Sequence, residues 1–270
     1  MSFLSAIAIA DKRIGKRGEG VYSGRARVVL ERSWIQFKSS AWLVVLSGFI
    51  EPLPNLVVFG YGVGIDGVPY LVFLAPALLV NAAIQGSMDE TVFSTLGGFL
   101  WAKTFYGMNA TPLGGRQIAL GVYWAALVRN IFTVVCYYLV MMLFGVLKAP
   151  HAWLAIPAGI LAGAAFGAVM LAFAGNVTNE DHFFTFVGRF AIQPMFFLSG
   201  TFFPLDSIPI YLRWIGWISP LWHATDLGRY LTYGHNISLT LVWVHVAYLV
   251  LMIIVGLTLA FKAFSKRLAK

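Results

Sequence analysis

The chain has 270 residues, of which 59% are hydrophobic and 11% are charged, and its formal net charge is +8. One soluble core of ordinary proportions cannot bury this much apolar surface, so the composition excludes a soluble globular domain and indicates an integral membrane protein. The positive charge invites a nucleic-acid interpretation, but most basic residues flank the apolar part of the chain, where membrane topology already explains them.

Six apolar runs are long enough to cross a bilayer, because a helix needs about 20 apolar residues to span ~30 Å of hydrocarbon. They cover residues 41–64, 70–88, 118–146, 152–174, 184–203 and 239–261. The runs are apolar on all sides, unlike the alternating strands of a membrane β-barrel, so we predict an all-α membrane protein with six transmembrane helices. Basic residues precede the first run and follow the last, which places both termini in the cytoplasm.

The segment before the first run has two parts. Residues 1–24 are polar, basic and rich in glycine, whereas residues 25–40 mix apolar and basic side chains. An amphipathic helix in the inner headgroup layer is the favoured interpretation of residues 25–40, and a solvated leader that only fixes topology is the alternative. We therefore divide the chain into residues 1–40, the leader and interfacial helix, and residues 41–270, the membrane domain.

Two charged residues lie deep inside apolar runs. Glu51 lies deep in the first run, next to Pro52, and a carboxylate at membrane depth costs about 2.5–3.5 kcal/mol on insertion scales. Arg129 lies about 16 Å into the third run at 1.5 Å per residue, near mid-membrane like Glu51. We hypothesise that Glu51 and Arg129 form an intramembrane ion pair, within one subunit or across a dimer.

The fourth run carries Gly159, Gly163 and Gly167 at four-residue spacing. Small residues at this spacing share one face of a helix and let two helix backbones approach closely. We expect a tight helix–helix contact on this face.

Residues 190–231 combine an apolar helix with a segment rich in proline and tryptophan. The helix loosens at Ser199 and Gly200, and three prolines and three tryptophans follow it: Pro204, Pro209, Pro220, Trp214, Trp217 and Trp222. Tryptophan suits the boundary between hydrocarbon and headgroups, because its ring has an apolar body and a polar N–H. We expect the membrane helix to break at the outer surface into short interfacial or re-entrant helices.

Motifs for chemistry are sparse. His223 and Asp226 can share a helical face in the outer segment, where a surface hydrogen bond is favoured over acid–base chemistry. No stretch matches the phosphate loop G-x4-G-K-[ST], the zinc motif H-E-x2-H, paired cysteines or G-x-S-x-G. We therefore expect neither an ATPase nor a metal site on this chain.

These motifs, taken in order, resemble the membrane subunits of type-2, export-type ABC transporters, and within them the branch that exports nodulation lipo-oligosaccharides and polysaccharides. The matching residues are Leu198, Ser199, Gly200, Phe202, Phe203, Pro204, Pro209, Ser219, Pro220, Leu221, Trp222, His223 and Arg229. The resemblance implies a permease that works as a dimer, expected to be of identical copies, with two separate ATPase subunits. ATP and Mg²⁺ would then bind to the partner and no cofactor to this chain.

The resemblance also implies a coupling helix in the loop between the second and third membrane helices, docked on the nucleotide-binding subunit. The matching residues are Lys103, Thr104, Thr111, Pro112, Leu113 and Arg116. A stiff element of this kind is needed physically, because only contacts that differ between two states of the motor can shift the membrane part. An ordinary polar connector is the alternative.

In the resembled family the first helix lines the substrate path, and we expect the fifth to move with it. The candidate residues are Phe49, Glu51, Phe59, Met195, Phe197 and Phe202. Their aromatic rings suit an amphipathic or lipid-linked cargo, such as a glycolipid, a polysaccharide or a drug, exported across a bacterial cell membrane. Two other function classes stay open: a membrane transferase that uses His223 and Asp226, and an ion-coupled transporter that uses Glu51.

The proposed pair of Glu51 and Arg129 is tested by exchanging the two charges. Glu51→Arg and Arg129→Glu should each abolish transport, because each leaves an unpaired charge in the membrane. The double variant should recover part of the transport rate measured in vesicles. A double variant as inactive as either single variant would contradict the pairing.

Overall fold

The structure, a computed structural model, describes residues 52–60, 69–178 and 192–269 and scattered positions between 26 and 50. All regular structure in these residues is helical, and no strand occurs among them. The prediction of an all-α protein is confirmed for this part of the chain.

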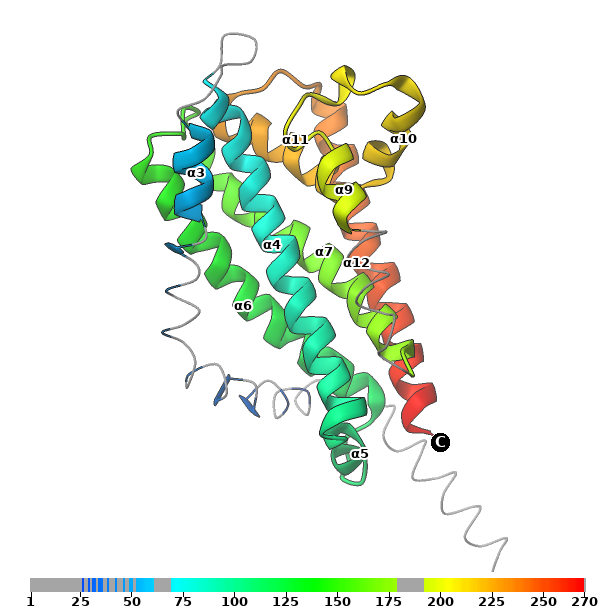
Figure 1. Ribbon diagram of the computed structural model, residues 1–270. Helices are drawn as coiled ribbons and strands as arrows, with labels where there is room; N and C mark the ends of the chain where they lie inside the picture. The colour runs from blue at the N-terminus through cyan, green and yellow to red at the C-terminus, as the bar shows by residue number, and fades with distance from the viewer. Residues whose placement is uncertain are drawn as a thin grey trace, which may run out of the picture.

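The helices follow one another in this order along the chain. The α-helices are α3 (Pro52–Gly60), α4 (Tyr70–Leu96), α5 (Thr104–Asn109), α6 (Gly115–Leu143), α7 (Ala155–Asn176), α9 (Gln193–Leu198), α10 (Ile210–Ile218), α11 (Pro220–Tyr233) and α12 (Leu239–Leu268). A π-helical turn, η2, covers Gly97–Trp101, and two 3-10 turns cover Ala152–Leu154 (η3) and Leu205–Ser207 (η5). Figure 1 shows four long helices, α4, α6, α7 and α12, running side by side, with α5 at one end and α9 to α11 at the other.

Within the described residues, four helical stretches are long and apolar enough to cross a membrane: Tyr70–Trp101, Gly115–Leu143, Ala152–Asn176 and Leu239–Leu268. Each has between 25 and 32 residues, which at 1.5 Å per residue exceeds the ~30 Å of the hydrocarbon layer. They confirm the second, third, fourth and sixth predicted runs. Helices α3 and α9 belong to the first and fifth runs, whose other parts lie mostly outside the described residues, so six crossings stay a prediction.

Helix α4 is longer than the sequence indicates. A loop is expected from Asp89 onward, but the helix continues through Asp89 and Glu90 to Leu96. Glu90 accepts hydrogen bonds from Arg129 at 2.8 Å and from Ser94 at 2.9 Å, and Gln85 donates to Asp89 at 3.4 Å. Because these carboxylates have partners within the bundle, the helix does not need to end where they begin.

Little of the leader lies among the described positions. Ala26 and Val29 are buried, whereas Trp34 and Ile35 are exposed. Val29 lies against α6, where a Cβ added to Gly121 would come within 2.4 Å of Val29 Cβ. This one-sided burial agrees with an amphipathic segment, but residues 1–25 lie outside the described part, and the interfacial helix stays a prediction.

Helix α7 packs against α4, α6, α11 and α12 and so forms the centre of the bundle. Its glycines face α4 and α6: a Cβ added to Gly159 would lie 2.7 Å from Leu79 Cδ2, and one added to Gly163 would lie 2.7 Å from the Ala83 carbonyl oxygen. On the other side, a Cβ added to Gly256 of α12 would lie 2.7 Å from the backbone of α7. The predicted close contact of the glycine face is confirmed.

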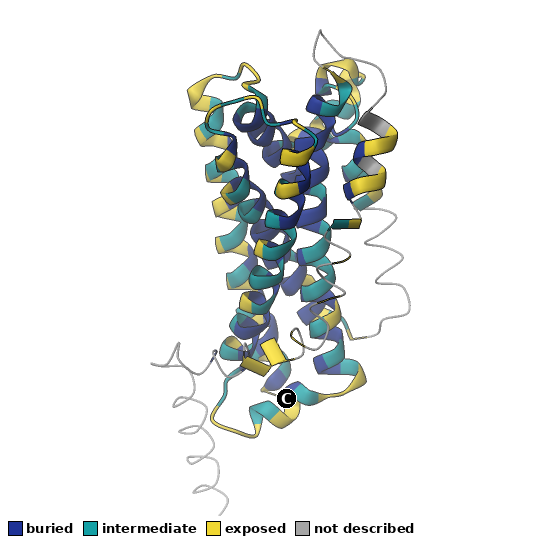
Figure 2. Ribbon diagram, turned by 90° about the vertical axis from the view of Figure 1, so that its left-hand side faces the viewer, coloured by how far each residue is buried: buried dark blue, intermediate teal, exposed yellow. Residues whose placement is uncertain are grey.

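Burial follows this arrangement (Figure 2). Buried residues fill the space between the long helices, and exposed residues lie on their outer faces and at the two ends. The outer faces carry large apolar side chains, among them Leu143, Trp243 and Leu251, each more than half exposed. In water this surface would be unstable, so the exposed apolar side chains agree with a lipid surrounding.

The tight contact of α7 predicts that an added methyl group destabilises the bundle. Gly163→Ala should lower the free energy of unfolding by about 1–3 kcal/mol, because the Cβ meets the α4 backbone and the buried Asn130. The matched control is Gly86→Ala on α4, whose Cβ would meet only Thr133 Oγ1 at 3.8 Å. Thermal unfolding in detergent measures both variants, and equal midpoints would contradict the prediction.

Candidate functional site

The end of the bundle that carries α5 is held together by aromatic rings. Phe99 of η2, Phe105 of α5 and Phe264 of α12 are all buried, with centroid distances of 5.0 Å from Phe99 to each of the other two. The Arg267 guanidinium lies 4.1 Å from the centre of the Phe99 ring, and Asn109 donates to the Leu268 carbonyl at 3.0 Å. Helix α5 is therefore fixed to the ends of α4 and α12.

The chain turns sharply as it enters α5. Lys103 has a φ of +51°, a left-handed conformation that side chains with a Cβ rarely adopt. Gly98 of η2 has no room for a side chain, because an added Cβ would lie 2.3 Å from the Phe105 ring. These two positions bring α5 back under the bundle.

The structure brings the predicted coupling residues to this end of the bundle. Lys103, Thr111, Pro112 and Arg116 are exposed there, and Thr104 and Leu113 are half-buried. The exposed face of α5 adds Tyr106, which the sequence analysis does not single out. The buried cluster of rings was not predicted either. Its only signal in the sequence is the pair Phe99 and Phe105, six residues apart, directly after two glycines.

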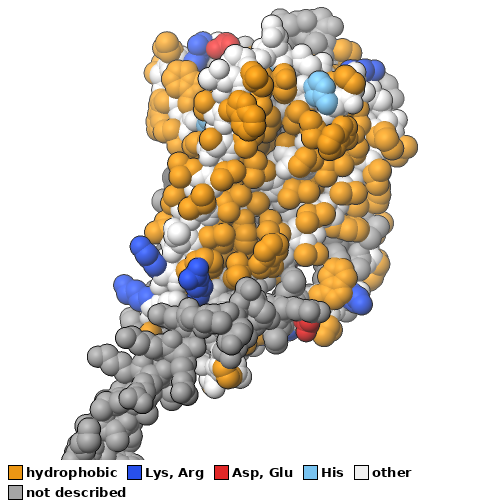
Figure 3. Space-filling view, turned by 180° about the vertical axis from the view of Figure 1, so that it is seen from behind, with side chains coloured by type: hydrophobic (Ala, Val, Ile, Leu, Met, Phe, Trp, Pro, Cys, Tyr) orange, Lys and Arg blue, Asp and Glu red, His pale blue; other side chains and the backbone are white. Residues whose placement is uncertain are grey.

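Charge differs between the two ends. Among the described residues from Lys103 onward, five basic side chains lie at the α5 end: Lys103, Arg116, Lys262, Lys266 and Arg267. At the opposite end, Lys148 and Arg213 are the basic residues of this described part that are not buried, and Arg213 pairs with Asp206 at 3.5 Å. Figure 3 shows a broad belt of hydrophobic side chains between the ends, with Lys and Arg side chains at its borders.

The end opposite α5 depends on one buried arginine. Arg229 of α11 donates to the carbonyl oxygens of Phe73 at 3.2 Å, Gly200 at 2.8 Å and Thr201 at 3.1 Å. Its guanidinium also lies 3.6 Å from the centre of the Phe73 ring. Burial lowers the pKa of Arg229 to about 10, so the side chain stays charged at neutral pH.

This arginine explains why the motif residues occur together. Two of the three carbonyls that it binds, those of Gly200 and Thr201, belong to the turn after α9, where Gly200 adopts a φ of +72°. Ser219 begins α11 by accepting a hydrogen bond from the Leu221 amide at 3.2 Å, and Pro220 occupies its first turn. The turn at residues 198–200 and the segment of residues 219–223 therefore meet through Arg229, which lies between them and α4.

Helix α10 is amphipathic, as the sequence predicts for this segment. Trp214 and Trp217 are more than half exposed, whereas Gly216 packs against Leu205. Pro204 lies directly before η5, and Trp222 of α11 is half-buried. The exposed indole rings at this end of the hydrophobic belt suit a membrane interface.

His223 and Asp226 are buried, in contrast to the expected surface hydrogen bond, and His245 of α12 lies between them. His223 Nδ1 lies 2.7 Å from His245 Nδ1, and His245 Nε2 lies 3.2 Å from Asp226 Oδ2. This bridge could not be predicted from the sequence, because His245 comes 19 residues after Asp226 on another helix.

The hydrogen bonds also fix where the protons lie. His223 Nε2 lies 3.0 Å from the Trp217 carbonyl, which can only accept, so His223 Nδ1 accepts from His245. The other ring nitrogen of His245, Nε2, faces the Asp226 carboxyl group. Burial, then the nearby His245, lower the pKa of His223 to about 4, which keeps its ring neutral. With all three residues buried, the cluster joins α10, α11 and α12.

Three candidate residues of the substrate path meet at the α9 end. The rings of Phe197 and Phe202 stack at 5.8 Å, and Met195 is buried close by on α9. Phe196, which the sequence analysis omits, completes this aromatic group at 5.0 Å from Phe202. Phe49 is half-buried against the same apolar core, whereas Glu51 and the side chain of Phe59 lie outside the described part.

Arg129 pairs with Glu90 in the described part of the bundle, at 2.8 Å. Both side chains keep some exposure, 39% for Arg129 and 20% for Glu90, so the guanidinium has room for a second partner. Since Glu51 is not described, its pairing with Arg129 stays a hypothesis. Glu90 gives that hypothesis a direct comparison, because the same charge exchange can be made at Glu90.

Comparisons with known proteins agree on one family. The family model described as ABC-2 type transporter matches residues 25–233. Nodulation protein J of Rhizobium leguminosarum bv. trifolii is 29% identical over 248 residues, covering 90% of this chain and 93% of the relative. Nodulation protein J of R. leguminosarum bv. viciae is 27% identical over 252 residues, covering 90% and 94%. That of Sinorhizobium fredii is 28% identical over 207 residues, covering 74% and 78%.

The role of Arg229 predicts that a lysine cannot replace it. Arg229→Lys should lower the free energy of unfolding by about 1–3 kcal/mol, because an ammonium group can neither reach three carbonyls as a planar fork nor stack on Phe73 in the same way. Arg213→Lys at the same end is the matched control, because Arg213 also donates to backbone carbonyls, those of Ile208 and Asp206, but these lie only five and seven residues away on its own segment, and the Asp206 side chain is 95% exposed. Thermal unfolding in detergent compares them, and an equal loss in both would refute the assignment.

Proposed function

This chain belongs to the ABC-2 type transporter family and is the membrane permease of an exporter, and we propose that it moves a lipid-linked saccharide or similar amphipathic cargo outward as a dimer with two separate ATPase subunits. The chain itself carries no phosphate loop. ATP and Mg²⁺ would therefore act in the partner, and this chain would convert the partner's movement into a change of the substrate path.

The observation that carries the proposal is the position of α5. Its outer surface, with Lys103, Tyr106 and Thr111, is exposed at one end of the bundle, whereas Phe105 is buried against α12. A short helix held in this way cannot move without the helices beneath it. It therefore supports the coupling role that the sequence predicts.

Movement of α5 has a direct route to the opposite end. η2 continues α4 without a break, α5 follows after the turn at Ala102 and Lys103, and α4 reaches Arg229 of α11 through the Phe73 carbonyl. The same arginine binds the Gly200 and Thr201 carbonyls, next to Phe197 and Phe202. We propose that closure of the two motors shifts α4 and α12 together and thereby changes the contacts of the α9 turn.

The aromatic group around α9 supports an amphipathic cargo. Phe197 is 57% exposed although it lies among other rings, so it is available to a ligand or to a second subunit. Rings of this kind bind acyl chains and sugar faces without strong directional demands. We propose a lipo-oligosaccharide or another lipid-linked saccharide, since the chain is similar to nodulation protein J over most of its length.

The proposed topology is six crossings in a bacterial cell membrane, with both termini in the cytoplasm and residues 25–40 in the inner headgroup layer. The excess of basic residues at the α5 end supports this orientation, because basic residues are enriched on the cytoplasmic side. The end of α12 lies at the same end as α5 (Figure 1). In this orientation α10 and α11 lie at the outer leaflet.

The test is to purify the tagged full chain in mild detergent, identify its partners and measure ATP hydrolysis. We expect a stoichiometric phosphate-loop ATPase. Lys103→Glu and Arg116→Glu should each lower ATPase recovery or turnover at least severalfold, because each reverses a charge exposed at the α5 end.

The matched control is Lys148→Glu, the same charge reversal at the opposite end of the bundle, which should leave recovery and turnover unchanged. Thermal midpoints of the three variants separate lost coupling from lost folding. Purification of the chain without any ATPase, or equal effects of the three variants, would overturn the proposal.

A further inference from the structure

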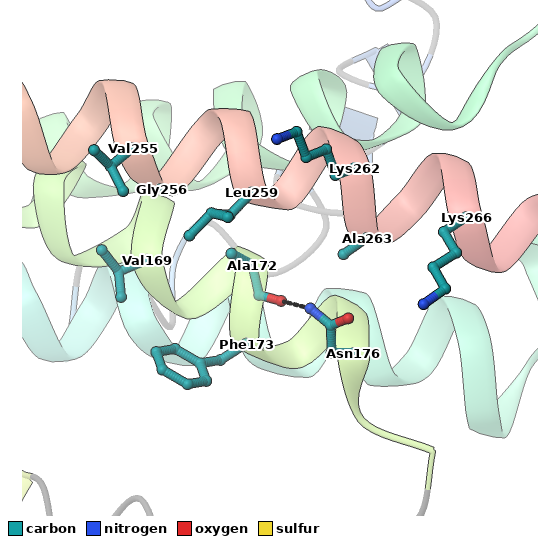
Figure 4. Close-up of a pocket in the computed structure, with 10 residues that line it drawn as sticks. All are labelled: Val169, Ala172, Phe173, Asn176, Val255, Gly256, Leu259, Lys262, Ala263 and Lys266. Atoms are coloured by element: carbon teal, nitrogen blue, oxygen red, sulfur yellow. Dashed lines mark hydrogen bonds between the residues drawn. The ribbon is translucent and has the colours of Figure 1, made fainter.

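A groove of about 330 Å³ lies between α7 and α12, near the α5 end. This is within the range of about 300–1,000 Å³ that small-molecule sites occupy. Figure 4 shows its lining from both helices: Val169, Ala172, Phe173 and Asn176 from α7, and Val255, Gly256, Leu259, Lys262, Ala263 and Lys266 from α12.

The lining changes from apolar to basic along the groove. Val255 and Leu259 come first on α12, and Lys262 and Lys266 follow, one turn apart along the helix. In Figure 4 the Lys262 side chain lies across α12, with its nitrogen pointing away from α7. Lys266 reaches from α12 toward the end of α7 (Figure 4). Within residues 52–60, 69–178 and 192–269, neither lysine has a carboxylate within ion-pair distance. The groove thus offers an apolar slot with positive charge at one end that no carboxylate of the described residues neutralises.

Close contacts fix the walls of the groove. Gly256 touches the backbone of α7 at Ala168, as its missing Cβ allows. At the basic end, Arg267 donates to the carbonyl oxygens of Gly175 at 3.3 Å and of Val177 at 2.5 Å, which ties the end of α7 to α12. Both contacts are independent of the side chains that line the slot, so the groove keeps its shape when these side chains are changed.

We propose that this groove binds an anionic phospholipid, with its phosphate at Lys262 and Lys266 and an acyl chain along Val255, Leu259 and Phe173. A basic pocket between membrane helices, at the border of the hydrophobic belt, matches an anionic headgroup that carries hydrocarbon. Its place in the inner leaflet follows from the topology proposed above, whereas the binding itself does not depend on that topology or on the ATPase.

Charge complementarity selects this occupant over others. A zwitterionic lipid brings its own cation next to the phosphate, which weakens the attraction to two lysines. Free phosphate gains nothing from the apolar slot, and a neutral hydrocarbon gains nothing from the lysines. The chain's own Glu180 and Asp181, outside the described residues, are the remaining rival for the two ammonium groups.

The test is native mass spectrometry of the delipidated full-length chain, titrated with phosphatidylglycerol or with phosphatidylcholine of the same acyl chains. We expect clear preference for phosphatidylglycerol. The double variant K262Q/K266Q should bind phosphatidylglycerol about tenfold more weakly, and K262R/K266R should keep its affinity. The control K103Q/K148Q, with the same loss of net charge outside the groove, should bind like the wild type.

Other results would overturn the proposal. Equal affinity for the two lipids would mean that hydrocarbon alone fills the groove. Displacement of the lipid by millimolar inorganic phosphate would indicate a soluble anion site. An unchanged affinity of K262Q/K266Q would place the lipid elsewhere or assign the lysines to the chain's own carboxylates. Thermal midpoints of all variants confirm that each one is folded.

Discussion

The bundle depends on the glycine face of α7, where no side chain separates the helix backbones. Gly159 and Gly163 let α4 and α6 approach the α7 backbone, and Gly256 does the same for α12 from the other side. In a membrane, lipid tails solvate apolar side chains as well as other helices do, so close backbone approach and van der Waals contact supply much of the association energy. The positions of the remaining helices follow from this contact, because α4, α6 and α12 are each placed against α7.

Helix α4 connects events at the two ends of the molecule. At one end it continues through η2 into α5, and at the other its Phe73 carbonyl and ring hold Arg229. Between these contacts α4 is one α-helix from Tyr70 to Leu96, with Pro76 as an internal residue that has no N–H to donate, so a displacement of one end can reach the other. The interior carboxylate Glu90 does not interrupt it, because Arg129 neutralises that charge within the bundle. The two ends are therefore parts of one mechanical unit, although no side chain of α5 contacts α11 directly.

The membrane helices could be predicted because bilayer thickness sets their length, and the glycine face because its spacing is local. Contacts between positions that are far apart in the sequence could not be predicted. Glu90 and Arg129 lie 39 residues apart, and nothing in either neighbourhood indicates the other. From its neighbours in the sequence, His245 is an ordinary residue of an apolar helix. Its contacts become visible only once α11 packs against α12. The candidate coupling residues followed from the family resemblance, whereas Phe105, which fixes α5 in place, has the same local pattern as any lipid-facing phenylalanine.

The three carbonyls held by Arg229 imply an order of assembly. A guanidinium is costly to remove from water alone, and its partners here come from α4 and from the turn after α9. Helix α4 and that turn both precede Arg229 in the chain, so all three acceptors have been synthesised before the arginine leaves the ribosome. Residues 199–233 can therefore dock as one closing step onto helices already in the membrane. Because synthesis starts at the amino terminus, Arg229 does not enter the bilayer before the three carbonyl groups that it binds.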